Sequence, residues 1–414
     1  MDANAKLILG TAYFGATHFF ERISYYGFRT LLVMYAVNEL AFSEASSYGL
    51  YENFTLIVYL IPLIVGPFLD FVFKAKHGPV IGGLFSVVGL IVAMIPDHLA
   101  LSVAVVFIGI GSSFSRLGIF MGLGNLFSRR DNRRDAAFSL DYIAVNLGAL
   151  IATTAIAFIG ENNGFNVAFS ICAVFSFLSA VLPLIVNLTG AFKKTNAGKS
   201  PFANQLDGVH EIERESELNT VQFLPKGEQR MRPLTLIYLF LSSVLIWVIF
   251  EQASMKSFQL TDRGNLFLSA QMYLTMFGLL VLSVILFFVN RKRHMVHYLY
   301  LGGLAMLMSL MTLVVVNFSS LGTQAVTIGF VLFGTLTEIL LTPIIISYIT
   351  RLVSPSFTGM ALGVFFASFA LMSWIGKHFD QGSTVQWALI VVLAIVLIIG
   401  GLLIKLLGIR KESF

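Results

Sequence analysis

The sequence predicts an all-α membrane protein with about twelve transmembrane helices. Apolar residues make up 57% of its 414 residues, charged residues make up only 12%, and the mean hydropathy is +0.84. These values lie outside the range of soluble globular domains. The apolar residues also form runs that are long enough to cross a hydrocarbon core of about 30 Å. Composition therefore indicates a chain that crosses the membrane many times.

The apolar runs follow one another along the whole chain. They lie at 8–36, 48–73, 78–96, 100–127, 136–160, 166–189, 233–258, 265–289, 296–316, 323–350, 356–376 and 384–407. One long polar stretch separates the sixth run from the seventh. We therefore predict an N-terminal six-helix bundle in residues 1–190, a cytoplasmic linker in 191–232 and a C-terminal six-helix bundle in 233–414. We expect no cleavable signal peptide, because the short head Met1–Lys6 leads directly into the first run.

The distribution of basic residues predicts the orientation of these helices. Lys and Arg collect in every second loop, at 74–76, at 129–134, in the linker, at 291–293 and at 410–411. The positive-inside rule then places both termini and the linker in the cytoplasm of a multi-pass protein of the plasma (inner) membrane. Two six-helix bundles joined by a cytoplasmic loop describe the major facilitator architecture, in which the solute lies near the midplane between the bundles.

The first apolar run contains an unusually polar segment, from His18 to Arg29. An ionisable side chain at the centre of a bilayer costs roughly 2.5–3.5 kcal/mol on the insertion scale, so several together need a reason. On a helix, His18, Arg22, Tyr25 and Arg29 share one face, with Glu21 and Tyr26 beside it. We expect this face to line a water-filled solute pathway inside the protein.

The remaining charges within the runs can pair across the two halves of the chain. Arg29 and Glu251 are both expected in the outer half of their helices, and Arg116 and Glu338 both on the cytoplasmic side of the centre. We predict that each pair acts as a gate that breaks as the bundles move. The alternative is that such charges form ion pairs that only stabilise the fold. Asp70 is expected to be a structural latch at the cytoplasmic end of the second run rather than a ligand.

Several motifs resemble those of one transporter family. The run Glu21-Arg22-Ile-Ser-Tyr25-Tyr26 is similar to the first-helix motif of the proton-dependent oligopeptide transporters, Glu-x-x-Glu-Arg-Phe-x-Tyr-Tyr. Further similar blocks are Arg133–Phe138 with Tyr142–Gly148, Trp247–Gln252, and Glu338–Pro343. The resemblance covers nearly the whole chain in the same order. It implies a proton-coupled symporter that imports di- and tripeptides by alternating access.

The resemblance also implies roles for individual residues. Arg22 and Arg116 would hold the peptide carboxylate, and Glu338 would hold its amino group. The other positions that would contact the peptide are Tyr25, Tyr26, Tyr59, Asn146 and Phe365. The acidic groups of the family are implicated in proton coupling, which here suggests Glu21, Glu251 and, in the place of the first acidic residue, His18. A cation and an anion on opposite walls also suit a zwitterion on physical grounds.

Four positions depart from the family pattern. His18 replaces a carboxylate and is either a proton-coupling group or a satisfied polar neighbour. Arg116 replaces the usual Lys, so it cannot deprotonate in practice but makes a better bidentate clamp. Thr275 lies near the place of an Asn-Pro pair. Asp141 stands where the family usually has an apolar residue, and it either partners an arginine or marks a shifted substrate.

These departures keep two other functions open. One is a carrier of the same fold for another organic anion or a peptide-like compound, and the other is a non-transporting membrane receptor or scaffold. Enzymatic motifs and a phosphate-binding loop are absent, so we expect no enzyme, no cofactor and a proton gradient as the driving force. The single cysteine, Cys172, excludes an internal disulfide and a thiolate metal site. We expect peptide, protons and the lipid bilayer as partners, no nucleic acid, and a functional monomer.

Overall fold

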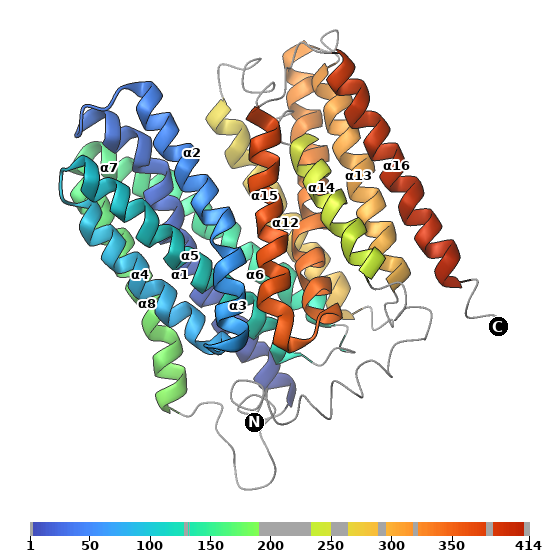
Figure 1. Cartoon of the computed structure of the whole chain (residues 1–414), viewed down its shortest axis with the longest axis horizontal. Coiled ribbons are helices and arrows are strands. Elements are labelled where there is room, and N and C mark those ends of the chain that lie inside the picture. The colour runs from blue at the N-terminus through green and yellow to red at the C-terminus, as the bar shows by residue number, and fades with distance from the viewer. Residues whose placement is uncertain are drawn as a thin grey trace, which may run out of the picture. The chain divides into compact units, whose positions relative to one another are not determined.

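The computed structural model describes residues 3–127, 131, 133–189, 233–249, 264–288, 295–317, 322–377 and 384–409. Within these ranges the chain is helical with short connections, and no strand occurs (Figure 1). The helices of the first part are α1 (Ala3–Asn38), α2 (Glu44–Leu60), α3 (Pro62–Phe71), α4 (Gly78–Ala93), α5 (His98–Leu126), α6 (Arg133–Ile151), α7 (Ala157–Asn163) and α8 (Phe165–Thr189). Those of the second part are Pro233–Ile249, α12 (Gly264–Phe288), α13 (Met295–Asn317), α14 (Gly322–Leu352), α15 (Thr358–Lys377) and α16 (Thr384–Ile409).

The helices confirm the predicted fold class. Among the described residues, six helical stretches are long and apolar enough to cross a membrane, and five shorter apolar helices accompany them. The helix α1 is not among the six. It is the helix that carries the polar segment from His18 to Arg29. The predicted linker and Glu251 lie outside the described residues, so nothing in the structure bears on them.

Two predicted runs are not single regular helices. The run 48–73 is divided at Ile61 into α2 and α3, because Pro62 has no backbone N–H with which to continue the ladder of hydrogen bonds. The run 136–160 contains a π-helical turn at Ala152–Ile156 between α6 and α7. Such turns occur often at functional sites of helical proteins.

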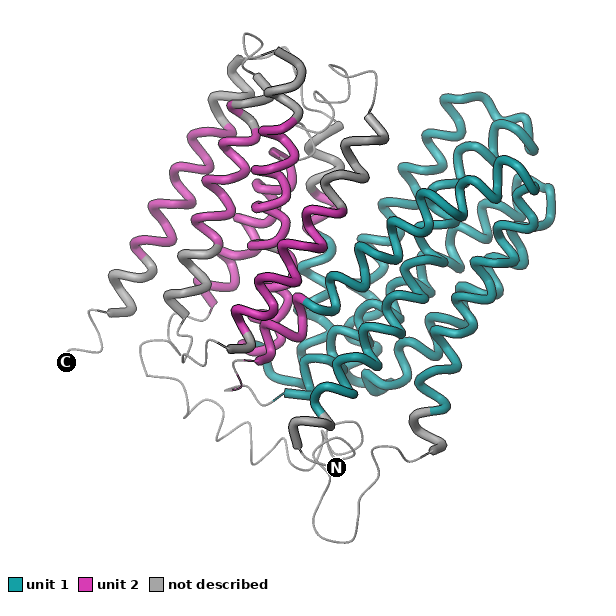
Figure 2. Tube along the Cα trace, turned by 180° about the vertical axis from the view of Figure 1, so that it is seen from behind, with its two compact units in different colours: residues 1–129, 140–210, 353–367 teal, residues 130–139, 211–352, 368–414 magenta. Residues whose placement is uncertain are grey.

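The described chain forms two compact units (Figure 2). Unit 1 contains residues 1–129, 140–210 and 353–367, and unit 2 contains residues 130–139, 211–352 and 368–414. The segments 130–139 and 353–367 therefore group with the unit that does not hold their sequence neighbours. The predicted bounds of the domains stay a prediction, and each unit is described here by itself.

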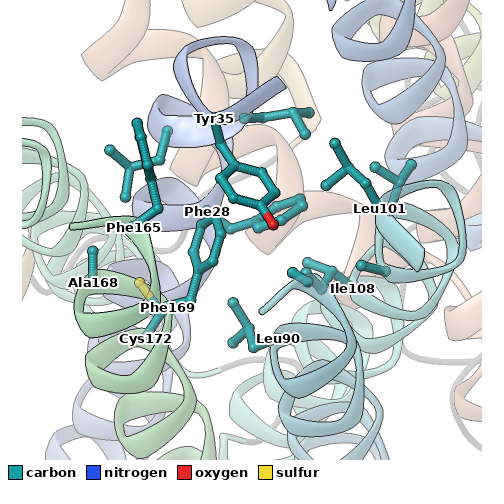
Figure 3. Close-up of a cluster of buried hydrophobic side chains, with 14 of the residues drawn as sticks. Phe28, Tyr35, Leu90, Leu101, Ile108, Phe165, Ala168, Phe169 and Cys172 are labelled. Carbon is teal, nitrogen blue, oxygen red and sulfur yellow. The ribbon is translucent and has the colours of Figure 1, made fainter. Parts of the chain in front are cut away.

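The core of unit 1 is apolar and rich in aromatic rings. The rings of Phe28 on α1 and Phe169 on α8 lie 5.7 Å apart, and the buried thiol-bearing Cys172 lies beside them (Figure 3). Leu90 of α4 and Ile108 of α5 belong to the same cluster. Lipid tails are as apolar as these side chains, so close van der Waals packing rather than escape from water holds the cluster together.

Candidate functional site

The polar segment of α1 contains a buried ion pair between adjacent residues. Arg22 donates hydrogen bonds from Nε and Nη2 to the two carboxylate oxygens of Glu21, and the second of these is 2.7 Å long. Its Nη2 also donates to the hydroxyl of Ser112 on α5, at 2.9 Å. Both side chains are almost fully buried. This bidentate arrangement neutralises the charge of Arg22 and fixes the plane of its guanidinium.

Two tyrosines of the same helix cover the guanidinium of Arg22. Its central carbon lies 4.6 Å from the centre of the Tyr25 ring and 5.7 Å from that of Tyr26. The two rings meet each other at a steep angle, with their centres 5.0 Å apart. Aromatic faces attract a cation, so the predicted residues Tyr25 and Tyr26 do lie with Arg22 in one cluster.

Arg116 on α5 is held in a different way. Its Nη2 donates to the backbone carbonyl of Val58 at 3.0 Å. That carbonyl is free to accept because the residue four positions on is Pro62, which has no N–H to donate to it. The local sequence of the second run thus creates the acceptor that positions Arg116.

Two aromatic rings also lie against Arg116. Its guanidinium lies 4.4 Å from the centre of the Phe366 ring on α15 and 5.8 Å from that of Tyr59. Its Nε is buried without a hydrogen-bond partner, and no carboxylate of the described residues forms an ion pair with it. Arg116 is therefore a buried cation that lacks a counter-ion in the described part of the chain.

His18 lies against α5 and α6. Its Nδ1 is 2.9 Å from Oδ2 of Asp141, and its ring meets that of Phe120 edge-on, with the centres 5.2 Å apart. The helices α1 and α6 come this close because Gly148 has no side chain, and a Cβ there would lie 2.8 Å from Cβ of Arg22. The expectation that Asp141 partners an arginine is wrong, since its partner is His18.

Three other predicted residues of the peptide site have contacts within their own units. Asn146 donates to the carbonyl of Tyr142 one turn earlier in α6, at 3.0 Å. Phe365 is buried and packs edge-on against Phe366. Glu338 belongs to unit 2, where it accepts a hydrogen bond of 3.2 Å from the hydroxyl of Thr275. Thr275, which stands near the place of the missing Asn-Pro pair, thus supplies a polar contact of its own.

The two predicted gate pairs stay predictions. Arg116 and Glu338 lie in different units, so their separation is not described. Glu251 lies outside the described residues, and Arg29 instead donates from Nε to the hydroxyl of Tyr51 on α2 at 2.9 Å. The guanidinium of Arg29 also lies 5.2 Å from the centre of the Tyr51 ring.

Family comparisons give this site its context. A model of the Major Facilitator Superfamily matches residues 14–377 of the chain. The chain belongs to the Major Facilitator Superfamily. This is a superfamily of transporters, which confirms the expected fold and the expectation of a multi-pass membrane carrier rather than an enzyme.

This Major Facilitator Superfamily protein is similar to curated peptide transporters. A di-/tripeptide transporter of Lactococcus lactis subsp. cremoris is 25% identical over 58% of this chain and 58% of its own length. The dipeptide and tripeptide permease A of Pectobacterium carotovorum subsp. carotovorum (strain PC1) is 31% identical over 39% of this chain and 32% of its own length. In both cases the chain spans less than two thirds of the relative.

Solved structures show the same fold over nearly the whole chain. A POT family transporter in complex with a thioalcohol-conjugated peptide superposes with a TM-score of 0.67 at 18% identity, covering 97% of this chain and 96% of the other. A POT family transporter in complex with 5-aminolevulinic acid gives a TM-score of 0.66 at 19% identity, with the same coverage.

Two residues that contact the arginines of this site were not predicted from the sequence. Ser112 and Phe366 carry no charge, and only the structure places them on the two arginines.

Asp70 fulfils the structural role expected of it, because its carboxylate accepts hydrogen bonds of 2.8 Å from the backbone N–H groups of Gly359 and Met360. It thereby caps the first turn of α15, the helix that carries Phe366.

Proposed function

We propose that this protein is a proton-coupled symporter that imports di- and tripeptides by alternating access. In this proposal Arg22 and Arg116 hold the peptide carboxylate and Glu338 holds the amino group. Tyr25, Tyr26, Tyr59, Asn146 and Phe365 form the surface against the peptide backbone and side chains. The family assignment and the names of the curated relatives support the choice of peptides as substrates.

The observation that carries the proposal is the state of Arg116. Its guanidinium is buried against two aromatic rings, it donates to one backbone carbonyl, and its Nε has no partner. A buried cation of this kind is unfavourable until an anion reaches it. A peptide carboxylate supplies the two oxygens that a planar guanidinium binds best. Arg22 uses Nε and Nη2 for Glu21 and Ser112, so its Nη1 is the nitrogen that can add to this grip.

The opposite end of the substrate requires an acceptor. Glu338 is partly buried in α14 and has the hydroxyl of Thr275 beside its carboxylate. An ionised carboxylate accepts hydrogen bonds at both of its oxygens, which suits Glu338 to a substrate ammonium group. Two charged ends held at a fixed separation would favour short peptides over longer ones.

Proton coupling, driving force and location complete the proposal. His18, Glu21 and Glu251 are the titratable groups proposed to carry protons, and the proton gradient takes the place of any cofactor. We propose that the protein works as a monomer in the plasma (inner) membrane with both termini in the cytoplasm, as the distribution of Lys and Arg predicts.

Uptake into proteoliposomes tests this proposal. The wild-type protein should accumulate a labelled dipeptide when the outside is more acidic, and should only equilibrate it without a pH difference. Glu338→Gln should abolish this accumulation while the protein stays folded. Glu161→Gln, which changes an exposed glutamate of α7, is the matched control and should transport normally. Normal accumulation by Glu338→Gln would refute the role of Glu338, and wild-type uptake that ignores the gradient would refute symport.

A competition experiment tests the substrate class. Unlabelled di- and tripeptides should reduce uptake of the labelled dipeptide, and tetrapeptides should not. We include 5-aminolevulinic acid, which is the ligand of one structural neighbour. Competition by this compound together with failure of all peptides would favour the organic-anion carrier over the peptide carrier.

A further inference from the structure

The pair formed by His18 and Asp141 is a second charged site, beside the cluster of Arg22. Both side chains are only 1% exposed, and the distance of 2.9 Å between Nδ1 and Oδ2 is that of a good hydrogen bond. The other polar atom of each group, Nε2 of His18 and Oδ1 of Asp141, has no hydrogen-bond partner among the described residues. The pair thus has two further positions at which a proton or water can bind.

The charge of this pair depends on a single proton. With a neutral imidazole, Nδ1–H donates to the Asp141 carboxylate and the pair carries one negative charge. A buried negative charge without a cation is costly in a medium of low dielectric constant. Addition of a proton at Nε2 gives an imidazolium beside a carboxylate, and the pair becomes neutral. A change of one proton therefore changes the net charge of the buried pair.

The neighbouring groups do not remove this dependence. The titratable residues within two turns of the pair and its aromatic neighbour Phe120 lie on three helices. They are Tyr13, Glu21, Arg22 and Tyr25 on α1, Arg116 on α5, and Arg134, Asp135 and Tyr142 on α6. Glu21 and Arg22 neutralise each other. The described side chains of α15, up to residue 371, include no titratable group. Arg116 forms no ion pair with a carboxylate of the described residues.

Two phenylalanine rings connect the pair to Arg116. The ring of His18 packs on Phe120, and the ring of Phe120 stacks on that of Phe366 with the centres 5.9 Å apart. The ring of Phe366 also lies against the guanidinium of Arg116, at 4.4 Å. A rearrangement of α15 that shifts Phe366 therefore changes the surroundings of the proton site and of the anion site together.

We propose that His18 and Asp141 act as one proton-binding unit of the transport cycle, with Asp141 as the residue that holds the proton on the imidazole. This inference rests on the proposed symport. In the loading step, the lone pair of Nε2 takes a proton from a hydronium ion, an N–H bond forms and a water molecule leaves. In the release step the same N–H bond breaks and water accepts the proton. The Asp141 carboxylate stays ionised and accepts the Nδ1–H bond throughout.

Asp141→Asn is the decisive variant. An asparagine keeps the size and a hydrogen bond but removes the charge that stabilises the imidazolium. Gradient-driven dipeptide accumulation should fall by about tenfold or more, because no carboxylate then faces the buried imidazolium. Counterflow of dipeptide at equal pH on both sides, which needs no net proton movement, should stay within about twofold, as expected when binding and alternating access are intact.

Two further variants complete the experiment. The exchange His18→Asp with Asp141→His restores an imidazole–carboxylate pair with the positions reversed and should recover part of the gradient-driven uptake. His98→Asn changes the histidine at the start of α5, whose ring bonds the Leu40 carbonyl, and it should leave both assays unchanged. A pH-sensitive dye inside the vesicles reports proton co-uptake directly, because its signal changes when dipeptide is added. Asp141→Asn should lose this change.

The outcomes separate this inference from the proposed function. If the wild type ignores the pH gradient, the symport proposal fails and this inference fails with it. If the wild type responds and Asp141→Asn responds equally, only the proton-binding unit is overturned. Loss of counterflow together with driven uptake in a well-folded Asp141→Asn protein would show a structural role instead, and would also overturn it.

Discussion

Arg22 and Arg116 are two buried arginines of the same unit with opposite states of compensation. Arg22 has a bidentate carboxylate, a hydroxyl and two aromatic faces. Arg116 has two aromatic faces and one backbone carbonyl. The first cation is neutralised by a neighbouring carboxylate, whereas the second forms no ion pair among the described residues. The comparison teaches that a charge within a membrane helix does not by itself measure binding capacity, because Arg22 has fewer donors left for a ligand than Arg116.

The same comparison can be made between the two acid–base pairs of α1. Glu21 and Arg22 are adjacent in sequence, and their proton positions are fixed because arginine does not deprotonate. His18 and Asp141 join two helices, and an imidazole, unlike a guanidinium, can exist with or without its second proton. The first pair is suited to hold geometry, and the second is suited to change charge.

The largest effect should come from breaking the compensated pair. Arg22→Gln leaves the Glu21 carboxylate buried without its cation, and we expect a loss of about 3–5 kcal/mol in the free energy of unfolding. Arg22→Gln combined with Glu21→Gln removes both charges and should recover a large part of this loss. Unfolding of the purified variants in detergent measures both effects. If the single variant were as stable as the wild type, the carboxylate would have to be compensated from elsewhere.

Substitution of the uncompensated arginine should affect binding rather than stability. Arg116→Gln should weaken dipeptide binding by about 1.5–3 kcal/mol, the contribution of a hydrogen bond to a charged group, and leave the protein at least as stable. Arg116→Lys keeps the charge but loses the planar fork, so its binding should be intermediate. Equilibrium binding of a labelled dipeptide measures these differences. A strongly destabilised Arg116→Gln protein would mean that an anion already compensates this side chain.

Much of the helical fold could be predicted from the sequence, because lipid imposes long apolar runs and their ends are marked by charged or polar residues. The run 48–73 shows where this fails in detail, since Pro62 divides it. The proline was visible in the sequence, and its missing N–H indicates that the Val58 carbonyl is open to another donor. That Arg116 supplies this donor depends on how α5 packs on α2, which helical periodicity alone does not determine.

The pairing of His18 with Asp141 shows the limit for the candidate site. The two residues are 123 positions apart, and each stands out only as a departure from the family pattern. Their contact could have been predicted from one signal in the sequence: one departure removes a carboxylate from α1, and the other introduces a carboxylate in α6. Nothing in a single sequence tells which face of α6 meets α1. The close approach at Gly148 decides it.

The smallest effect should come from an ion pair outside the membrane-spanning segments. Asp131, in the connection between α5 and α6, accepts hydrogen bonds from Arg133, of which the shortest is 2.7 Å. Burial acts to raise the pKa of Asp131, but the hydrogen bonds and charge of Arg133 outweigh it and hold the pKa below its ordinary value of 3.8. This pair contrasts with Glu21 and Arg22 because solvent reaches it.

Asp131→Asn should therefore cost no more than about 1 kcal/mol of unfolding free energy, and the cost should shrink in high salt. Because the pKa of Asp131 is depressed in the folded protein, its stabilising contribution is full above the ordinary value of 3.8 and is lost as the pH falls below that value. Unfolding of the wild type and of Asp131→Asn, compared at neutral pH and near pH 3, should show the difference only at neutral pH. If Asp131→Asn lost as much unfolding free energy as Arg22→Gln, the difference in burial would not explain how much each ion pair stabilises the protein.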